Sequence, residues 1–446
     1  MAEPTSTEAR PTRAYVIHPD LGNARTQRRT PEHALAEAVA LAHALPGIEI
    51  VGEEVARLRD PNPGTLFGKG KLAEIGTRLE TAEAELVLVD GPVSPVQQRN
   101  LEQAWDAKLL DRTGLILEIF ADRARTREGV LQVELAALSY QRTRLVRAWT
   151  HLERQRGGLG FVGGPGETQI EADRRAIDEQ MTRLRRQLDR VVRTRTLHRA
   201  ARAKVPYPIV ALVGYTNAGK STLFNRMTGA EVMAKDMLFA TLDPTMRAIR
   251  LPDAGGGSSG RKIILSDTVG FISDLPTELV AAFRATLEEV LEADLILHVR
   301  DISHPETEEQ AADVAEILDS LGVDENVALI EVWNKIDALS EDTRAALRRT
   351  DARTEGVQAV SALSGEGLGD LVSAIDTHLA RVLDEARSTD IVILPFSDGR
   401  RRAWLHEAGV VEREEATEDG LRLHLSWTER QKAGFAALDE AANGGQ

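Results

Sequence analysis

Gly214-Tyr-Thr-Asn-Ala-Gly-Lys-Ser221 directly follows the apolar run Ile209-Val-Ala-Leu-Val213. The run predicts a buried strand, and Gly-x4-Gly-Lys-Ser predicts a phosphate-binding loop with a helix starting at its end. The glycines let backbone N–H groups approach a polyphosphate, the Lys220 ammonium supplies charge at the β and γ phosphates, and the Ser221 hydroxyl can ligate Mg²⁺. A chance match in an unrelated turn would lack the strand before it and the helix after it. The stretch therefore predicts an α/β fold that binds a nucleoside triphosphate.

A second motif, Asp267-Thr-Val-Gly270, follows the apolar run Ile263-Ile-Leu-Ser266. The carboxylate at the strand end can hold Mg²⁺ through water, and the glycine N–H can sense a γ-phosphate. This loop is therefore a candidate switch, whose conformation depends on the nucleotide.

A third motif, Asn334-Lys-Ile-Asp337, follows the apolar run Val327–Trp333. A buried carboxylate here accepts hydrogen bonds from guanine N1–H and the exocyclic amine, a donor pair that adenine lacks. Leaving that acid unpaired costs on the order of 1–3 kcal/mol, enough to reject ATP about tenfold. Ser361-Ala-Leu363 would close the base pocket with backbone N–H groups. The motifs together predict a guanine-nucleotide site, and Asp337 argues against a P-loop kinase.

Between the first two motifs lies Phe239-Ala-Thr-Leu-Asp243-Pro-Thr245. Either threonine of this segment could reach Mg²⁺ when a γ-phosphate orders the loop. Spacing cannot separate two threonines four residues apart, and a capping or turn hydroxyl is the alternative interpretation.

These motifs, together with Gly157-Gly-Leu-Gly-Phe-Val-Gly-Gly-Pro-Gly-Glu-Thr-Gln169, resemble the HflX family of ribosome-associated GTPases, within the Obg- and HflX-like superfamily. The glycine-rich segment and the Phe-Ala-Thr-Leu-Asp segment are its specific parts, and the similarity covers most of the chain. The resemblance favours Thr241 over Thr245. It implies GTP-dependent binding to the large ribosomal subunit and its rRNA, and a role in splitting or rescuing ribosomes under stress.

The expected site residues fall into three groups. Those expected to bind nucleotide are Gly214, Tyr215, Thr216, Asn217, Ala218, Gly219, Lys220, Ser221, Thr222, Phe239, Ala240, Thr241, Leu242, Asp243, Asp267, Thr268, Val269, Gly270, Asn334, Lys335, Ile336, Asp337, Ser361, Ala362 and Leu363. Those expected to hold Mg²⁺ are Ser221, Thr241 and Asp267, and those expected to act in hydrolysis are Lys220, Thr241 and Gly270.

Hydrolysis would be in-line attack of water on the γ-phosphate, with Lys220 and Mg²⁺ stabilising the spread charge. Many GTPases place a water-orienting glutamine after the switch glycine, whereas Phe271 holds that place here. We therefore expect slow turnover without a partner, and the alternative is a GTP-gated ribosome-binding assembly factor with negligible turnover. Asn217 resembles the asparagine by which potassium-dependent GTPases hold K⁺, and a turn-stabilising asparagine is the alternative.

Composition limits the remaining possibilities. The chain has 446 residues, a formal charge of −15 and no cysteine, which excludes disulfides, thiolate zinc sites and a cysteine nucleophile. No leader-like start and no apolar run near about 18 residues is present, so we expect a cytoplasmic protein without a membrane span, and a monomer.

One stretch reverses this acidic balance. From Arg142 to Lys204, sixteen Lys and Arg stand against seven Asp and Glu, a net charge of plus nine. Apolar residues recur there at steps of three, four or seven, namely Leu131, Leu135, Leu138, Leu145, Trp149 and Leu152, and then Ile170, Ile177, Met181, Leu184, Leu188 and Val191. The pattern predicts an antiparallel hairpin of two helices of about 25 to 35 residues, with a reach on the order of 40 Å. Its arginines suit rRNA, or form a solvated face with ion pairs. The glycine-rich link, with Phe161, is either an RNA-contacting tip or a flexible linker.

We expect a disordered tail over 1–12, an α/β domain over 13–125, the hairpin over 126–204, a P-loop GTPase domain over 205–385 and a small α/β domain over 386–446. Gly64-Thr-Leu-Phe-Gly-Lys-Gly-Lys71 has no strong strand before it and predicts a turn before a helix, although its lysines could touch RNA phosphate. Residues 254–260 predict a hairpin loop without a chemical role, and residues 438–446 a mobile end.

Overall fold

A computed structural model describes residues 10–22, 29–155, 165–202, 207–229, 238–239, 241–242, 245–251, 260–273, 289–324, 327–351, 356–385, 387–417, 420–428, 431–432 and 435–436. Outside these ranges lie Ala240, Asp243, Phe161 with most of the glycine-rich link, most of the loop expected at 254–260, and most or all of the expected terminal tails. Among the described residues, no helix combines the length and apolar character needed to cross a membrane.

The first domain is a parallel sheet with strand order β2-β1-β3-β4. Its strands are β1 (Thr12–Asp20), β2 (Ile48–Arg57), β3 (Leu86–Val89) and β4 (Lys108–Asp111), and its helices are α1 (Pro31–Ala44), α2 (Lys69–Thr81), α3 (Pro95–Trp105) and α4 (Arg112–Arg123). Short, fully buried strands such as Leu86-Val-Leu-Val89 are typical of a parallel sheet covered on both faces. Helix α2 starts at Lys69, so residues 64–68 form the predicted turn before a helix, and Lys69 and Lys71 lie in the first turn of that helix.

Helix α3 was not anticipated from the sequence, although a signal was present. Ser94 accepts a hydrogen bond from Gln97 N, and the Gln97 side chain accepts one from Ser94 N, which together form a capping box followed by Pro95 in the first turn. The pattern Ser-Pro-x-Gln is therefore a helix-start signal that the sequence itself contains.

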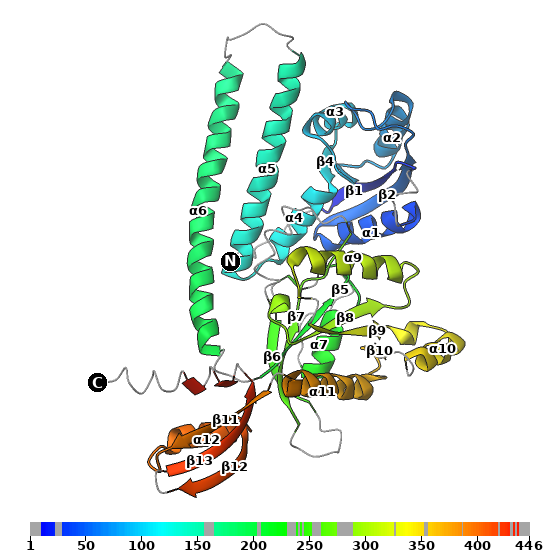
Figure 1. The fold of residues 1–446 in the computed structure, drawn as a ribbon. Helices are drawn as coiled ribbons and strands as arrows, with labels where there is room; N and C mark the ends of the chain where they lie inside the picture. Colours follow the sequence, from blue (N-terminus) through cyan, green and yellow to red (C-terminus); the bar gives the residue numbers. More distant parts are fainter. Residues whose placement is uncertain are drawn as a thin grey trace, which may run out of the picture.

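The hairpin consists of α5 (Arg127–Gln155) and α6 (Pro165–Arg202), which lie side by side and stand apart from the sheets (Figure 1). Leu131, Met181 and Leu184 are buried along its seam, as the periodicity predicts. The side chains of Leu145, Trp149, Leu152 and Ile170 lie outside the described residues. Helix α6 has 38 residues and is longer than expected, which at about 1.5 Å per residue makes it roughly 57 Å long.

The central domain is a six-stranded sheet with order β10-β9-β8-β5-β7-β6, in which only β6 runs antiparallel to its neighbour. Its strands are β5 (Ile209–Gly214), β6 (Thr245–Arg250), β7 (Lys262–Asp267), β8 (Leu295–Asp301), β9 (Ala328–Asn334) and β10 (Val357–Ala359). Its helices are α7 (Lys220–Thr228), α9 (Thr307–Leu321), the single turn η1 (Ile336–Ala338), α10 (Glu341–Asp351) and α11 (Leu368–Glu385). The phosphate loop, the Asp267 motif, the Asn334 motif and the 361–363 segment lie at the carboxyl ends of the parallel strands β5, β7, β9 and β10, where open α/β sheets bind ligands. The segment that contains Thr241 instead precedes the antiparallel strand β6 and so reaches the same edge of the sheet.

The last domain is an antiparallel sheet with order β11-β13-β12, formed by β11 (Arg387–Leu394), β12 (Val411–Thr417) and β13 (Gly420–Thr428), with α12 (Gly399–Glu407) beside it. Leu394, Leu405, Leu423 and Trp427 form its core. It lies at the end of the molecule away from the first domain (Figure 1). Strand β12 was not predicted, because Val-Glu-Arg-Glu-Glu-Ala-Thr shows no apolar alternation.

Candidate nucleotide-binding site

The phosphate loop has a backbone that only glycine fits at two positions. Gly214 has φ +151°, and a Cβ there would lie 2.1 Å from the Val299 carbonyl oxygen. Gly219 has φ +93°, and a Cβ there would lie 2.2 Å from Nδ2 of Asn334. Strand β5 therefore ends in a loop pressed against β8 and β9, and α7 begins at Lys220 with its amino terminus beside the loop.

Lys220 is buried behind this loop. Its Nζ donates hydrogen bonds to the carbonyl oxygens of Gly214 at 3.1 Å and Tyr215 at 2.7 Å. Burial lowers the pKa of Lys220 to about 8, against the opposing effect of the Asp267 charge. A cation with two neutral partners and one nearby carboxylate has little charge compensation, so an anion in the loop would be favoured.

Three oxygens, one from each predicted metal ligand, lie within hydrogen-bond distance of one another. Ser221 Oγ lies 2.7 Å from Asp267 Oδ2 and 2.8 Å from Thr241 Oγ1, and Thr241 Oγ1 lies 2.9 Å from the same carboxylate oxygen. Neighbouring oxygens of an octahedral Mg²⁺ are also roughly 2.9 Å apart. Asp267 Oδ1 is buried without a hydrogen-bond partner, and burial raises the pKa of this carboxyl. The donor set and the orphaned oxygen both fit a hard divalent cation.

The segment after Asp267 lies against the phosphate loop. Thr216 N donates to Phe271 O at 2.7 Å, and Phe271 N donates to Gly214 O at 3.1 Å. A Cβ on Gly270 would come within 2.9 Å of Thr216 Cα and 3.0 Å of Lys220 Nζ. The second motif thus touches the first at the place where Lys220 ends, while Thr268 and Val269 are buried behind it.

The base-recognition segments are joined by Asn334. Its Nδ2 donates to Ala218 O at 2.8 Å, and its Oδ1 accepts from Ala362 N at 2.9 Å. Lys335 forms an ion pair with Asp301 at 2.8 Å. Ile336 and Ser361 are buried, whereas Leu363 is 73% exposed.

Asp337 corrects one expectation. We expected a buried acid in the base pocket from the sequence, but Asp337 is exposed, because the turn η1 carries it beyond the end of β9. The fold of the protein by itself therefore does not bury this carboxylate.

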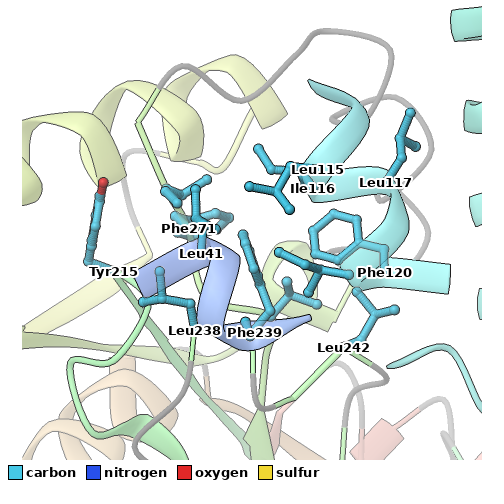
Figure 2. Packing of buried hydrophobic residues seen from close by; sticks show 14 of the residues in the cluster. Leu41, Leu115, Ile116, Leu117, Phe120, Tyr215, Leu238, Phe239, Leu242 and Phe271 are labelled. Carbon is cyan, nitrogen blue, oxygen red and sulfur yellow. The ribbon is translucent and has the colours of Figure 1, made fainter. Parts of the chain in front are cut away.

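Three expected site residues direct their side chains away from the phosphate loop. Tyr215, Phe239 and Leu242 are buried in a hydrophobic cluster shared with the first domain, so any contact they make with a nucleotide is through the backbone. Phe239 has φ +55°, which is rare for a bulky residue, and its ring packs edge-on against Phe120 of α4 with centroids 4.6 Å apart (Figure 2). Phe271 is 2% exposed in the same cluster.

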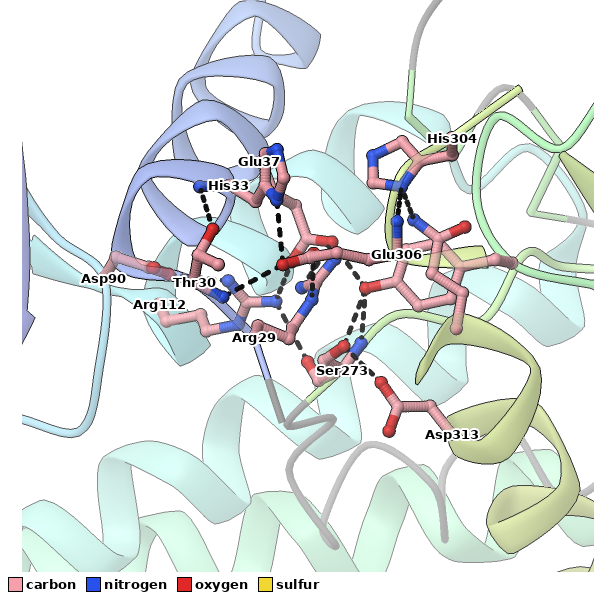
Figure 3. Close-up of polar contacts among 12 residues, drawn as sticks. Arg29, Thr30, His33, Glu37, Asp90, Arg112, Ser273, His304, Glu306 and Asp313 are labelled. Atoms are coloured by element: carbon pink, nitrogen blue, oxygen red, sulfur yellow. Dashed lines mark hydrogen bonds and ion pairs between the residues drawn. The ribbon is translucent and has the colours of Figure 1, made fainter. Parts of the chain in front are cut away.

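A buried polar network also joins the first domain to the site, and sequence analysis did not identify it. The Tyr215 hydroxyl bonds to the Glu37 carboxylate and, at 2.8 Å, to Ser273 Oγ. Arg112 pairs with Glu37 and Asp90, both at 2.6 Å, and donates to Ser273 O at 2.9 Å (Figure 3). Burial raises the pKa of the Tyr215 phenol, so the hydroxyl stays neutral and donates to Glu37.

Models of protein families match nearly the whole chain. Residues 32–121 match a model of the GTP-binding GTPase N-terminal region, residues 123–202 the GTP-binding GTPase middle region, residues 209–335 a 50S ribosome-binding GTPase, and residues 346–438 the HflX C-terminal domain.

Curated relatives agree with this assignment. The chain is 53% identical over 367 residues to the GTPase HflX of Magnetococcus marinus, covering 82% of each chain. It is 44% identical over 374 residues to the GTPase HflX of Escherichia coli, covering 84% of this chain and 85% of that one. It is 42% identical over 399 residues to the GTPase HflX of Caldanaerobacter subterraneus, covering 89% and 88%.

Proposed function

Because the chain belongs to the HflX family of GTPases and hydrolyses GTP, we propose that it acts on the large ribosomal subunit and binds it in its GTP form. The match of residues 209–335 to a 50S ribosome-binding GTPase carries this proposal. The hairpin supports it, because the arginines 174, 175, 183, 185 and 186 of α6 lie on exposed positions that can reach RNA phosphates.

The proposed task is to split or rescue ribosomes under stress. A GTPase whose triphosphate state favours one subunit can drive subunits apart, because its differential affinity shifts their equilibrium. The alternative is an assembly factor in which GTP only gates ribosome binding. Phosphate release separates the two functions, since the alternative predicts negligible turnover with and without ribosomes. We also propose that the protein is a monomer. We propose that it is cytoplasmic, because its proposed partner, the ribosome, lies in the cytoplasm.

Within the site, we assign Lys220 to the β and γ phosphates and the Gly270 N–H to the γ-phosphate. The closeness of Gly270 to Lys220 Nζ supports both roles. Ser221, Thr241 and Asp267 would hold Mg²⁺, which when bound neutralises charge on the phosphate oxygens. The Asp337 carboxylate would receive the guanine N1–H and amine, and the bound base would cover it.

The position of Phe271 supports slow intrinsic turnover. Its side chain is packed among residues of the first domain and offers no group to orient water. The ribosome would then supply the missing water positioning by ordering the loop that contains Thr241.

This is tested by measuring phosphate release with purified large subunits, small subunits or neither. We expect stimulation by large subunits alone, and loss of it in a Lys220→Ala control. Equal rates in the three conditions would contradict the proposal.

Asn217 supports a second cofactor, K⁺. Its side chain is exposed at the loop, and its φ of +58° places it in the left-handed region, so the residue turns the loop as well. A monovalent cation held there would add positive charge beside the phosphates, where many GTPases use an arginine. Turnover should be faster in K⁺ than in Na⁺, and Asn217→Gly, which keeps the turn, should abolish the difference. Equal rates in both salts would show that K⁺ is not a cofactor.

A further inference from the structure

The guanine-selecting acid is held by a residue outside every recognised motif. Asp337 is exposed and follows Lys335, whose φ is +64°, in the single turn η1. Such a turn has few hydrogen bonds of its own to fix a carboxylate. Arg344, on the next helix α10, lies against it.

The Arg344 guanidinium binds the turn through its backbone. Nε donates to Ile336 O at 3.0 Å, and Nη2 donates to Asp337 O at 3.1 Å and to Leu339 O at 3.5 Å. Nη1 lies 3.7 Å from the carboxylate of Glu366, in the loop that follows Ser361-Ala-Leu363. One planar group therefore contacts three carbonyl oxygens of the turn and the carboxylate that follows the second base-recognition segment, a geometry that lysine cannot reproduce.

A second arginine, Arg226, contacts the loop of the other base-recognition segment. Arg226 of α7 donates from Nη2 to Ser364 O at 2.7 Å and to Leu363 O at 3.3 Å. Gly365 lies beside the guanidinium, where a Cβ would be 2.9 Å from Arg226 Nη2, and its φ of +92° is a backbone conformation that favours glycine. Arg226 thus ties the loop of Ala362 to the helix that starts at the phosphate loop.

We propose that Arg344 and Arg226 are positioning residues for guanine recognition, acting on different edges of the base. The inference rests on the proposed roles of Asp337 and of the 361–363 loop. Arg344 holds the acid that would receive N1–H and the exocyclic amine, whereas Arg226 holds the 361–363 loop, which would donate a backbone N–H to O6. Both arginines are partly exposed, so the Arg344–Glu366 ion pair and the hydrogen bonds from Arg226 to backbone carbonyls add little to folding stability, and the main effect of both residues is on geometry.

The two roles give different signatures with GDP and inosine diphosphate, which lacks the exocyclic amine but keeps N1–H and O6. Arg344→Ala should reduce GDP affinity by about tenfold and inosine diphosphate affinity by clearly less, because GDP loses two hydrogen bonds to Asp337 and the analogue one. Their affinity ratio should therefore move toward one. Arg226→Ala should weaken both ligands equally and leave the ratio unchanged.

The experiment is calorimetric titration of the full chain with both diphosphates, together with ADP. Arg344→Lys is the second variant, and should recover part of the ratio because it keeps one donor. Asp342→Ala, an exposed change on the same helix, is the matched control and should match the wild type. A purely structural role would lower the thermal midpoint and the bound fraction without altering the ratio.

An unchanged ratio in Arg344→Ala, with the wild type preferring GDP, would overturn this inference alone. A wild type that binds ADP as tightly as GDP would instead overturn the proposed base site. The two failures are therefore distinguishable in one set of titrations.

Discussion

Lys220 is the residue whose environment most directly links structure to solution behaviour. It is 6% exposed and lies among backbone carbonyls and the Asp267 carboxylate. Burial disfavours its ammonium, whereas bound phosphates would favour it. Nucleotide binding and protonation of this one amine should therefore be coupled.

We predict that GDP affinity falls as the pH rises through the range where free Lys220 titrates. Burial sets that pKa at about 8, and phosphates raise it, so above this value binding takes up a proton. The affinity should then decrease toward about tenfold per pH unit. Calorimetry at about pH 6.5 and about pH 8.5, each in buffers of different ionisation enthalpy, should show proton uptake only at the higher pH. Equal affinities without uptake would contradict the assignment of Lys220 to the phosphates.

The site residues that can be predicted from the sequence are those that lie in one recognisable motif and contact residues of another. Ser221, Thr241 and Asp267 come together at one edge of the sheet, because Ser221 follows β5, Asp267 ends β7 and Thr241 precedes the antiparallel β6. Glu37 and Arg344 could not be predicted, since nothing local indicates that an acid of α1 meets Tyr215, or that an arginine of α10 faces backbone carbonyls. Such contacts depend on how separate elements dock.

At the scale of elements, α1 and α4 of the first domain cover the segments that carry Thr241 and Phe271. Phe120 meets Phe239 (Figure 2), and Glu37 meets Tyr215, so apolar and polar contacts act at the same interface. The sequence predicted the two domains but not this contact, because a buried helix face does not identify what covers it. The strained Phe239 is held by the surrounding packing.

Phe120→Ala should destabilise the chain by about 3–5 kcal/mol, because a fully buried ring leaves a cavity at the interface. Urea unfolding followed by circular dichroism measures this change. Phe396→Ala, a matched change at a ring that is 63% exposed, should alter stability by less than about 0.5 kcal/mol. Similar effects of the two substitutions would show that the Phe120 contact does not join the domains.

The hairpin arginines should act on ribosome affinity without affecting nucleotide binding. Replacing Arg174, Arg183 and Arg186, all exposed on α6, by alanine should weaken binding to the large subunit. The slope of log affinity against log salt should become shallower by about one for each phosphate that an arginine no longer neutralises. Replacing Arg400, Arg413 and Arg422 of the last domain removes equal charge elsewhere and is the control. If both triple variants bind the large subunit equally well, the hairpin arginines form a solvated face with ion pairs and do not contact rRNA.

At the scale of the whole molecule, a strongly acidic chain carries one basic arm. The overall charge of −15 opposes non-specific binding to RNA, while the stretch from Arg142 to Lys204 is net positive. Helix α4 of the first domain contacts the segment that contains Thr241 and leads directly into α5 of the arm (Figure 1). This connectivity places the proposed ribosome-binding element next to the part of the molecule that contacts the switch segments.

The most direct test of GTP-dependent action on the large subunit is co-sedimentation with separated ribosomal subunits, in GDP and in a non-hydrolysable GTP analogue. We expect the chain to pellet with large subunits in the analogue and to remain mostly in the supernatant in GDP. Equal pelleting in both nucleotides, or pelleting with small subunits alone, would refute GTP-dependent binding to the large subunit.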